Sequence, residues 1–271
     1  MKKIATLLIP VLLCVLCFCA CIKREQKEKT ESLRIVSLSP ALTELIFQLG
    51  AEKSLQGRTD VCDFPDSPDL KAVPVVGTFG GPEVEKVILR KPTHIFANTL
   101  IQPQLKKKLS ESGSKVVVHP CDTLKDYLRW VDLLGMELNK RAAAEKERTR
   151  IETWLKENTA RKGSGKKLLF VLWDQPLTVA GAGTLPDSAI RLAGGINAAA
   201  SEKGYFKCSS EFLLTAEFDG LVWALDKPYS LKRDLPLWRV PDPDLLLRPG
   251  PRFPDGVDAL RTWLEKTEAP E

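Results

Sequence analysis

The chain has 271 residues, of which 44% are apolar and 28% are charged, and its formal net charge is +5. This length accommodates one large domain or two modest ones, and the apolar content excludes intrinsic disorder. The charge is too small and too evenly mixed in sign for a nucleic-acid-binding protein, so we expect no nucleic-acid partner.

Residues 1–20 have the pattern of an export signal. Two lysines, Lys2 and Lys3, precede an apolar run, and Ala20 stands directly before Cys21. The segment resembles a bacterial lipoprotein signal in which Cys21 would carry the lipid, although Phe18 stands where leucine is usual. An uncleaved membrane anchor is the alternative. Either interpretation exports the rest of the chain and attaches it to the cell membrane, at its periplasmic or extracellular face.

Residues 21–32 are polar and charged and lack hydrophobic periodicity, so they are predicted to be a flexible tether. Three cysteines follow the tether, at Cys62, Cys121 and Cys208. Their odd number and wide spacing indicate no disulfide framework. We expect all three to be buried and to behave as small apolar residues.

Residues 33–121 are predicted to form a first α/β lobe. The stretch RIVSLSP is a short apolar strand that Pro40 ends, and residues 41–50 have the apolar spacing of a helix that Gly50 stops. After a loop rich in proline, residues 82–98 predict a short helix and a strand. Residues 103–118 predict another such pair. Strands that alternate with helices are typical of a parallel sheet.

Residues 122–162 are predicted to be helical and to join two lobes. Thr123 and Asp126 have the spacing of a capping box, at the start of a helix that we expect to end at Gly135. Residues 137–162 contain no glycine or proline and few apolar residues. They are therefore predicted to form a long helix with much of its surface exposed.

Residues 163–271 return to the first pattern and are predicted to form a second lobe. Residues 166–173 predict a strand, the stretch TLPDSAIRLAGG a helix ended by Gly194, residues 209–224 a helix and a strand, and the residues from about Asp255 a last helix. The predicted fold class is therefore α/β, with two Rossmann-like lobes joined by one long bridging helix.

One helix–strand unit occurs in both lobes. The stretches PEVEKVILRKPTHIFAN and SSEFLLTAEFDGLVWA align without a gap at an offset of 126 residues, which places Glu85 over Glu211 and Ile95 over Leu221. A glutamate in the first turn of a helix also offsets the helix dipole, which contributes about 0.3–1 kcal/mol. The repetition favours a further role for the two glutamates as a matched pair.

Four stretches together resemble a known family: RIVSLSPALTELIFQLG, VVGTFGGPEVEKVILRKPTHIFAN, AIRLAGGINAAA and LLLRPGPRF. They are similar, in this order, to the substrate-binding proteins of ABC importers for vitamin B12, haem and ferric siderophores. The resemblance extends from about Leu33 to Leu264. It implies two lobes bridged by a rigid helix, a transported metal chelate held between them, and an ABC permease dimer with its ATPase as partner. It implies neither a resident cofactor nor an enzymatic activity.

The resemblance also implies a role for the paired glutamates. In this family a glutamate on each lobe docks into an arginine-lined pocket of the permease, and Glu85 and Glu211 match those positions. Carboxylates that meet guanidinium groups form charge-assisted bidentate contacts, which would set the register of the two proteins.

Five further residues match positions in the ligand cleft of the family. Flat apolar walls suit a large planar macrocycle, and for each aromatic residue core packing is the alternative. The candidates are Pro40, Phe79, Trp173, Tyr205 and Arg248. Two other positions that carry aromatic residues in vitamin B12-binding relatives are occupied here by Val61 and Asn98.

These residues rank the candidate ligands and the alternative functions. A corrinoid is expected first, haem second and a ferric siderophore third, because siderophores usually need several basic residues and Arg248 is the one placed in the cleft. His94 and His119, at strand edges, are expected to be structural and are too few for a metal site. An exported lipoprotein hydrolase or a surface adhesin is the alternative of another class, although no catalytic motif is found.

Overall fold

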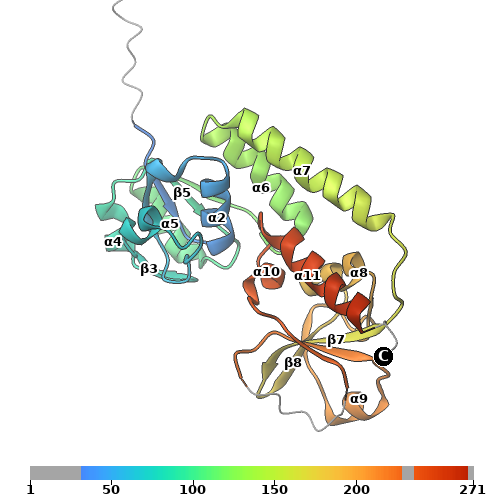
Figure 1. The fold of residues 1–271 in the computed structure, drawn as a ribbon. Coiled ribbons are helices and arrows are strands. Elements are labelled where there is room, and N and C mark those ends of the chain that lie inside the picture. The colour runs from blue at the N-terminus through green and yellow to red at the C-terminus, as the bar shows by residue number, and fades with distance from the viewer. Residues whose placement is uncertain (1–31, 228–234, 268–271) are drawn as a thin grey trace, which may run out of the picture. The chain divides into compact units, whose positions relative to one another are not determined.

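The computed structural model describes residues 32–227 and 235–267 (Figure 1). The predicted signal and Cys21 lie outside these ranges, as does all but the last residue of the tether. Residues 34–271 form one compact unit. None of the helices within the described ranges combines the length and the apolar character that crossing a membrane requires.

The sheet of the first lobe is parallel throughout, as predicted. Its strands lie in the order β2-β1-β5-β6, so the first strand in the sequence is central and is flanked by later ones. Such an order is typical of doubly wound α/β folds. The strands are β1 (Ile35–Ser37), β2 (Leu55–Arg58), β5 (His94–Ala97) and β6 (Lys115–Val118).

Helices cover this sheet and a small ribbon extends from it. Pro40, predicted to end the strand, is the first residue of α2, while Gly50, with a φ of +67°, follows the helix end as the sequence predicts. Val36, Val87 and Ile95 are completely buried in the core between sheet and helices. The elements are α2 (Pro40–Gln48), η1 (Glu52–Ser54), α3 (Pro68–Ala72), α4 (Val84–Leu89), α5 (Pro103–Glu111) and the ribbon of β3 (Gly77–Thr78) and β4 (Gly81–Pro82).

Two helices lead from the first lobe to the second. The capping box of Thr123 and Asp126 is present at the start of α6 (Leu124–Glu137), and α7 (Arg141–Thr159) is the predicted long helix. The prediction that Gly135 ends a helix is wrong, because α6 continues to Glu137. A Cβ at Gly135 would lie 2.5 Å from the Cβ of Ala144, so this glycine allows α6 and α7 to pack closely.

The second lobe contains a mixed sheet in place of the expected repeat of the first pattern. Strands β7, β11 and β12 are parallel, but β7 turns back at residues 175–176 into antiparallel β8, which pairs with antiparallel β10. The strand order is β10-β8-β7-β11-β12, with β9 also paired to β7. The strands are β7 (Lys167–Asp174), β8 (Leu177–Ala180), β9 (Ile196–Asn197), β10 (Tyr205–Lys207), β11 (Gly220–Trp223) and β12 (Leu237–Arg239).

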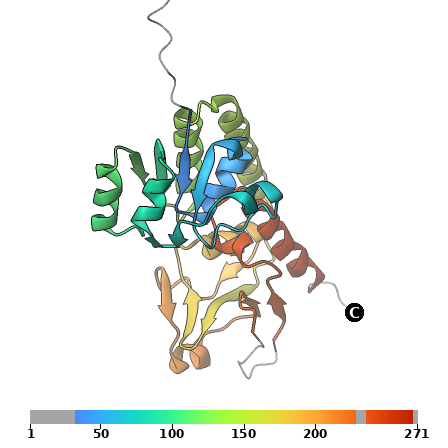
Figure 2. The ribbon, with the colours of Figure 1, turned by 90° about the vertical axis from the view of Figure 1, so that its left-hand side faces the viewer.

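Figure 2 shows the two lobes as separate groups of elements. Within the described ranges, four helices accompany the sheet of the second lobe. Thr184 caps the first of these helices and Gly194, with a φ of +97°, ends it, as predicted. Phe170, Val222 and Phe253 are fully buried in the core of the second lobe. The helices are α8 (Leu185–Ala193), α9 (Ser210–Thr215), α10 (Asp244–Leu247) and α11 (Phe253–Lys266).

The repeated unit keeps its offset at every boundary. Helices α4 and α9 each have six residues, strands β5 and β11 each have four, and the first and last residues of both pairs are 126 positions apart. Strand β5 lies between β1 and β6, and β11 lies between β7 and β12. The two copies therefore occupy equivalent places in their sheets, which confirms the predicted repeat.

The three cysteines of the described chain are free thiols. Cys62 and Cys121 are buried, as expected, and burial raises the pKa of Cys121 to about 12. Cys208 is only half-buried, so the expectation of burial was wrong at this position. It follows β10 near the surface of the second lobe, where the sequence carries no signal of its exposure.

Candidate functional site

The carboxyl ends of the parallel strands mark the candidate site, because ligands of α/β folds bind beyond those ends. In the first lobe Asn98 follows β5 and Asp122 follows β6. In the second lobe Tyr205 begins β10. Desolvation, and next the charge of Asp122, raise the pKa of the Tyr205 hydroxyl to about 12. Asp122 begins the segment that joins the two lobes, so Tyr205 lies on the side of the second lobe that is near this segment.

Three large aromatic side chains at this site are partly open to solvent. The exposed fraction is 38% for Phe79, 52% for Trp173 and 50% for Tyr205. Side chains as exposed as these are not packed inside a core, so core packing does not account for any of the three. Phe79 comes from the first lobe and the other two from the second. Their assignment to ligand contact stays a prediction.

Local contacts position these aromatic residues. Phe79 lies in the turn between β3 and β4, and its backbone N–H donates to Asp60 Oδ1 at 3.1 Å. Trp173 donates from Nε1 to the carbonyl oxygen of Gln175 at 3.0 Å, within the turn from β7 to β8. The Nζ of Lys227 lies 5.4 Å from the centre of the Trp173 ring.

Two other candidate positions, Pro40 and Asn98, offer less to a ligand. Pro40 is buried in the first turn of α2, which leaves little of its surface for contact. Asn98 is also buried, and its Oδ1 accepts the backbone N–H of Leu100 at 3.1 Å. Val61, in contrast, is exposed.

Arg248 binds carboxylates of both lobes. Its guanidinium group lies 2.8 Å from Asp63 Oδ1, 3.4 Å from Glu44 Oε1 and 2.6 Å from Asp244 Oδ2. Burial alone would raise the pKa of Asp63, but the hydrogen bond and charge of Arg248 outweigh it and lower that pKa. The sequence predicts Arg248 as a ligand contact, whereas the structure places it in ion pairs that connect the lobes.

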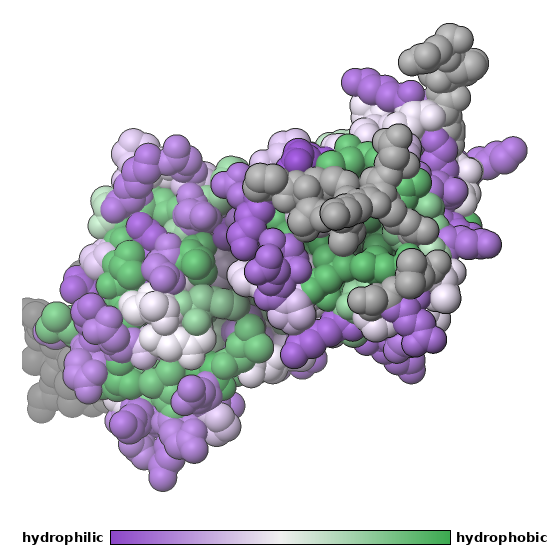
Figure 3. Space-filling view, turned by 90° about the horizontal axis from the view of Figure 1, so that it is seen from below, coloured by the Kyte–Doolittle hydropathy of each residue, from purple (hydrophilic) through white to green (hydrophobic). Residues whose placement is uncertain are grey.

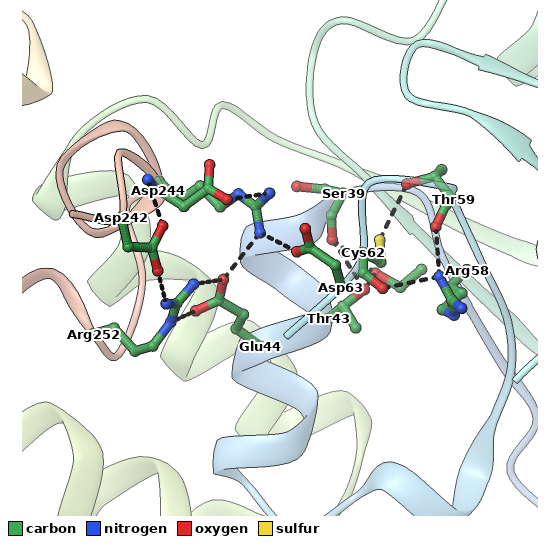
Figure 4. Close-up of polar contacts among 12 residues, drawn as sticks. Ser39, Thr43, Glu44, Arg58, Thr59, Cys62, Asp63, Asp242, Asp244 and Arg252 are labelled. Carbon is green, nitrogen blue, oxygen red and sulfur yellow. Dashed lines mark hydrogen bonds and ion pairs between the residues drawn. The ribbon is translucent and has the colours of Figure 1, made fainter. Parts of the chain in front are cut away.

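Arg252 makes a second connection of the same kind (Figure 4), which sequence reasoning missed. Its Nε and Nη2 donate to the two carboxylate oxygens of Glu44 at 2.9 and 2.8 Å, and its Nη1 donates to Asp242 at 2.7 Å. Burial lowers the pKa of Arg252, but its hydrogen bonds and charge interactions with Glu44 and Asp242 together outweigh burial and raise that pKa. The available signal was Glu44 itself, a charge among the apolar residues of the α2 stretch, which needs a partner.

Glu85 and Glu211 are exposed second residues of α4 and α9. Neither makes an ion pair within the described ranges of the chain. Neither glutamate caps its helix. The start of α4 has no side-chain cap, and the cap of α9 is the Ser209 hydroxyl, which accepts the Phe212 N–H. Both carboxylates are therefore available to a partner, and α4 and α9 lie at the ends of the lobes remote from α7 (Figure 1).

Two cavities lie apart from these aromatic residues. One of 670 Å³ is lined by α7, α8 and the turn at residues 163–165. Another of 580 Å³ lies beside Arg252 and includes Glu44, Phe64 and Arg150. Phe79, Trp173 and Tyr205 line neither of these two cavities.

The described residues contain no group of three or more His, Cys, Asp and Glu side chains that could hold a metal ion. His94 contacts Glu137 at 3.3 Å through Nε2 and the Thr93 hydroxyl at 3.0 Å through Nδ1. His119 packs its ring edgewise against Trp130. Both histidines thus have structural partners.

Comparisons with known proteins concern the family and the fold. Residues 35–234 match the family described as periplasmic binding protein. The chain is 26% identical over 257 residues to the uncharacterized ABC transporter substrate-binding lipoprotein YvrC of Bacillus subtilis, across 86% of this chain and 80% of that one. It is 27% identical over 185 residues to the vitamin B12-binding protein of Salmonella choleraesuis, across 63% of this chain and 64% of that one.

A solved structure shares the fold. The periplasmic heme-binding protein HutB of Vibrio cholerae superposes with a TM-score of 0.76 at 24% identity, over 86% of this chain and 99% of that one. This likeness confirms the predicted fold class of two α/β lobes joined by a long helix.

Proposed function

Because this chain belongs to the periplasmic binding protein family, we propose that it is an extracytoplasmic substrate-binding protein of an ABC importer. Its ligand is a planar metal macrocycle, held between the two lobes and delivered to a permease dimer with its ATPase. A corrinoid is the first choice and haem the second. The observation that supports this most directly is the set of three partly exposed aromatic residues, Phe79, Trp173 and Tyr205, which come from both lobes.

Exposed aromatic rings are costly to leave in water and are well suited to stack on a flat ring system. Figure 3 shows apolar surface exposed over both lobes on one face of the molecule, with hydrophilic residues around it. A siderophore fits less well, because its negative groups need free cations, and Arg248 is already paired with three carboxylates.

The relatives support both macrocycles. The similar protein of Salmonella choleraesuis is named for vitamin B12, and the similar structure from Vibrio cholerae is named for heme. The similar protein of Bacillus subtilis is named as a lipoprotein, which supports lipid attachment at Cys21 and a membrane-tethered location for this chain.

Binding is tested by an absorbance titration of the full chain in detergent with cobalamin, haemin and a ferric siderophore. We expect saturable binding of cobalamin or haemin, and at least about tenfold weaker binding after Tyr205→Ala or Phe79→Ala, since loss of a buried aromatic contact costs over 1.4 kcal/mol. Met136→Ala, at an exposed apolar residue of α6, is the matched control. Absence of saturable binding to all three compounds would overturn the ligand assignment.

Docking is tested separately from binding. Charge reversal at both Glu85 and Glu211 should abolish association with the permease and leave ligand affinity unchanged. Reversal at Glu111 and Glu217, exposed glutamates of the first and second lobes, controls for net charge. If ligand affinity and permease association fall together, the two glutamates are structural residues.

A further inference from the structure

Glu44 is a buried carboxylate at the contact between the two lobes. It lies in α2, only 3% exposed, between residues of the same helix that are almost completely buried, such as Leu45. An ionised carboxylate in such a place is unfavourable unless cations compensate it directly. The cations that do so come from the second lobe.

Arg248 and Arg252 reach Glu44 across 204 and 208 residues of sequence. The Arg252 contact is bidentate, the geometry in which a guanidinium group binds a carboxylate most strongly. Arg252 also places its guanidinium carbon 3.7 Å from the centre of the Phe64 ring, which belongs to the first lobe. Both arginines are thus fixed on the surface of a lobe to which they do not belong.

The charges at this contact do not balance. Two guanidinium groups are shared by four carboxylates, two from each lobe (Figure 4). Without the arginines, carboxylates of both lobes would face each other and repel. The carboxylates are Glu44 and Asp63 of the first lobe and Asp242 and Asp244 of the second.

Residues 248–252, which contain both arginines, are also attached to the bridging helix α7. Arg150 of α7 donates to the carbonyl oxygen of Pro251 at 2.7 Å and to Glu147 at 2.8 and 2.9 Å. Glu147 is buried, and it accepts from Tyr127 of α6 at 2.7 Å and from Gln48 of α2 at 2.9 Å. Residues 248–252 are therefore held by α2 and α7 together.

We propose that residues 248–252 are a brace that sets the angle between the lobes. Opening the lobes requires Arg248 and Arg252 to leave Glu44, which breaks ion pairs that are largely shielded from solvent. The lobes therefore keep the arrangement of the structure until a partner supplies the energy to break the contact. The brace does not depend on the identity of the ligand or of the permease.

Hydrogen exchange of the full chain in detergent, followed by mass spectrometry, tests the brace. Glu44→Gln keeps the size of the side chain and removes its charge. We expect at least tenfold faster exchange in residues 59–63 of the first lobe and in residues 242–253 of the second, both at once. Asp258→Asn, which removes an exposed ion pair with Arg261 on α11, should change neither segment.

A second variant separates the brace from local damage to α2. Arg252→Lys keeps the positive charge and loses the guanidinium group that binds both oxygens of Glu44. Residues 59–63 and 242–253 should therefore exchange faster than in the wild type but more slowly than in Glu44→Gln. Faster exchange confined to α2 and β1 would mean that Glu44 only stabilises its own lobe and would overturn the proposal. Unchanged exchange of both segments in either folded variant would overturn it as well. If Glu44→Gln does not fold, Arg252→Lys decides by the same two segments.

Discussion

The two lobes share three parallel strands and differ in the strands that lie beside them. Strands β1, β5 and β6 of the first lobe correspond to β7, β11 and β12 of the second, with the repeated helix–strand unit in the middle. Beside β1 the first lobe adds the parallel strand β2, whereas beside β7 the second adds the antiparallel strands β8 and β10 and the short parallel strand β9. Strands β1 and β11 of the shared part are buried along their whole length, which allows few arrangements of their residues. The strands that differ all lie on one side of the shared part.

The helices of the repeated unit differ on their surfaces. The start of α9 has a side-chain cap from Ser209, while the start of α4 at Glu83 has none. At the end of α4, Leu89 is 70% exposed, and its counterpart in α9 is the polar Thr215. The two helices therefore share a glutamate at their second position and differ in exposed apolar surface.

The largest effects should come from the shared core. Ile95 and Leu221 are counterparts in β5 and β11, and both are completely buried. Replacing either by alanine should lower the free energy of unfolding by about 2–5 kcal/mol, because a cavity replaces packed methyl groups. Urea denaturation measures the change. Leu100→Ala, at an exposed residue of the first lobe, should stay within about 0.5 kcal/mol.

A loss below about 1 kcal/mol at one of the two positions would show that the lobes do not bury their central strands equally. The comparison of the lobes would then hold for the backbone only.

Removing the residue at the start of each helix should give a smaller difference in stability between the two lobes. Ser209→Ala removes the hydroxyl that accepts the Phe212 N–H at 3.0 Å and should cost about 0.5–2 kcal/mol. Glu83→Ala removes only an exposed ion pair with Lys86, worth about 0.2–0.5 kcal/mol. Thermal unfolding of the two variants measures the difference. Equal losses would mean that the α9 cap is not used in solution.

The smallest effect is a pH dependence confined to the first lobe. His94 in β5 has Gly220 as its counterpart in β11, so the second lobe has no titrating group there. Burial lowers the pKa of His94 below 6.5, and the charge of Glu137 only partly opposes this. The unfolded state therefore binds more protons just below pH 6.5, and stability should fall as the pH drops through that range.

Melting temperatures at pH 7.5 and 5.5 measure this dependence. His94→Gln should reduce the difference between the two melting temperatures. A part of the difference should remain, because burial also lowers the pKa of His119. A larger pH dependence in His94→Gln than in the wild type would contradict the assignment.

Features that depend on neighbouring residues were predictable from the sequence. Pro40 and Gly50 delimit α2, the capping box begins α6, and Gly194 ends α8, because each acts within one or two turns of its own helix. Gly135 shows where this fails. A glycine is typical of a helix end, but Gly135 lies inside α6, where it packs against Ala144 of α7.

The same limit applies to the candidate site. The resemblance selected Phe79, Trp173 and Tyr205, and the structure shows that all three are partly exposed. Arg252 was missed and Arg248 was assigned to a ligand, because their partner Glu44 is more than 200 residues away in the sequence.

The sequence by itself determined the α/β pattern, the repeat at an offset of 126 residues and the matched glutamates Glu85 and Glu211. These follow from apolar periodicity, turn residues and spacing, which are local properties. Only the tertiary structure decided that β8 and β10 turn antiparallel, and that Glu44 and Arg252 hold the lobes together. Ion pairs between distant segments leave no periodic pattern, because the charge that each buried group needs is supplied wherever the fold brings the chain.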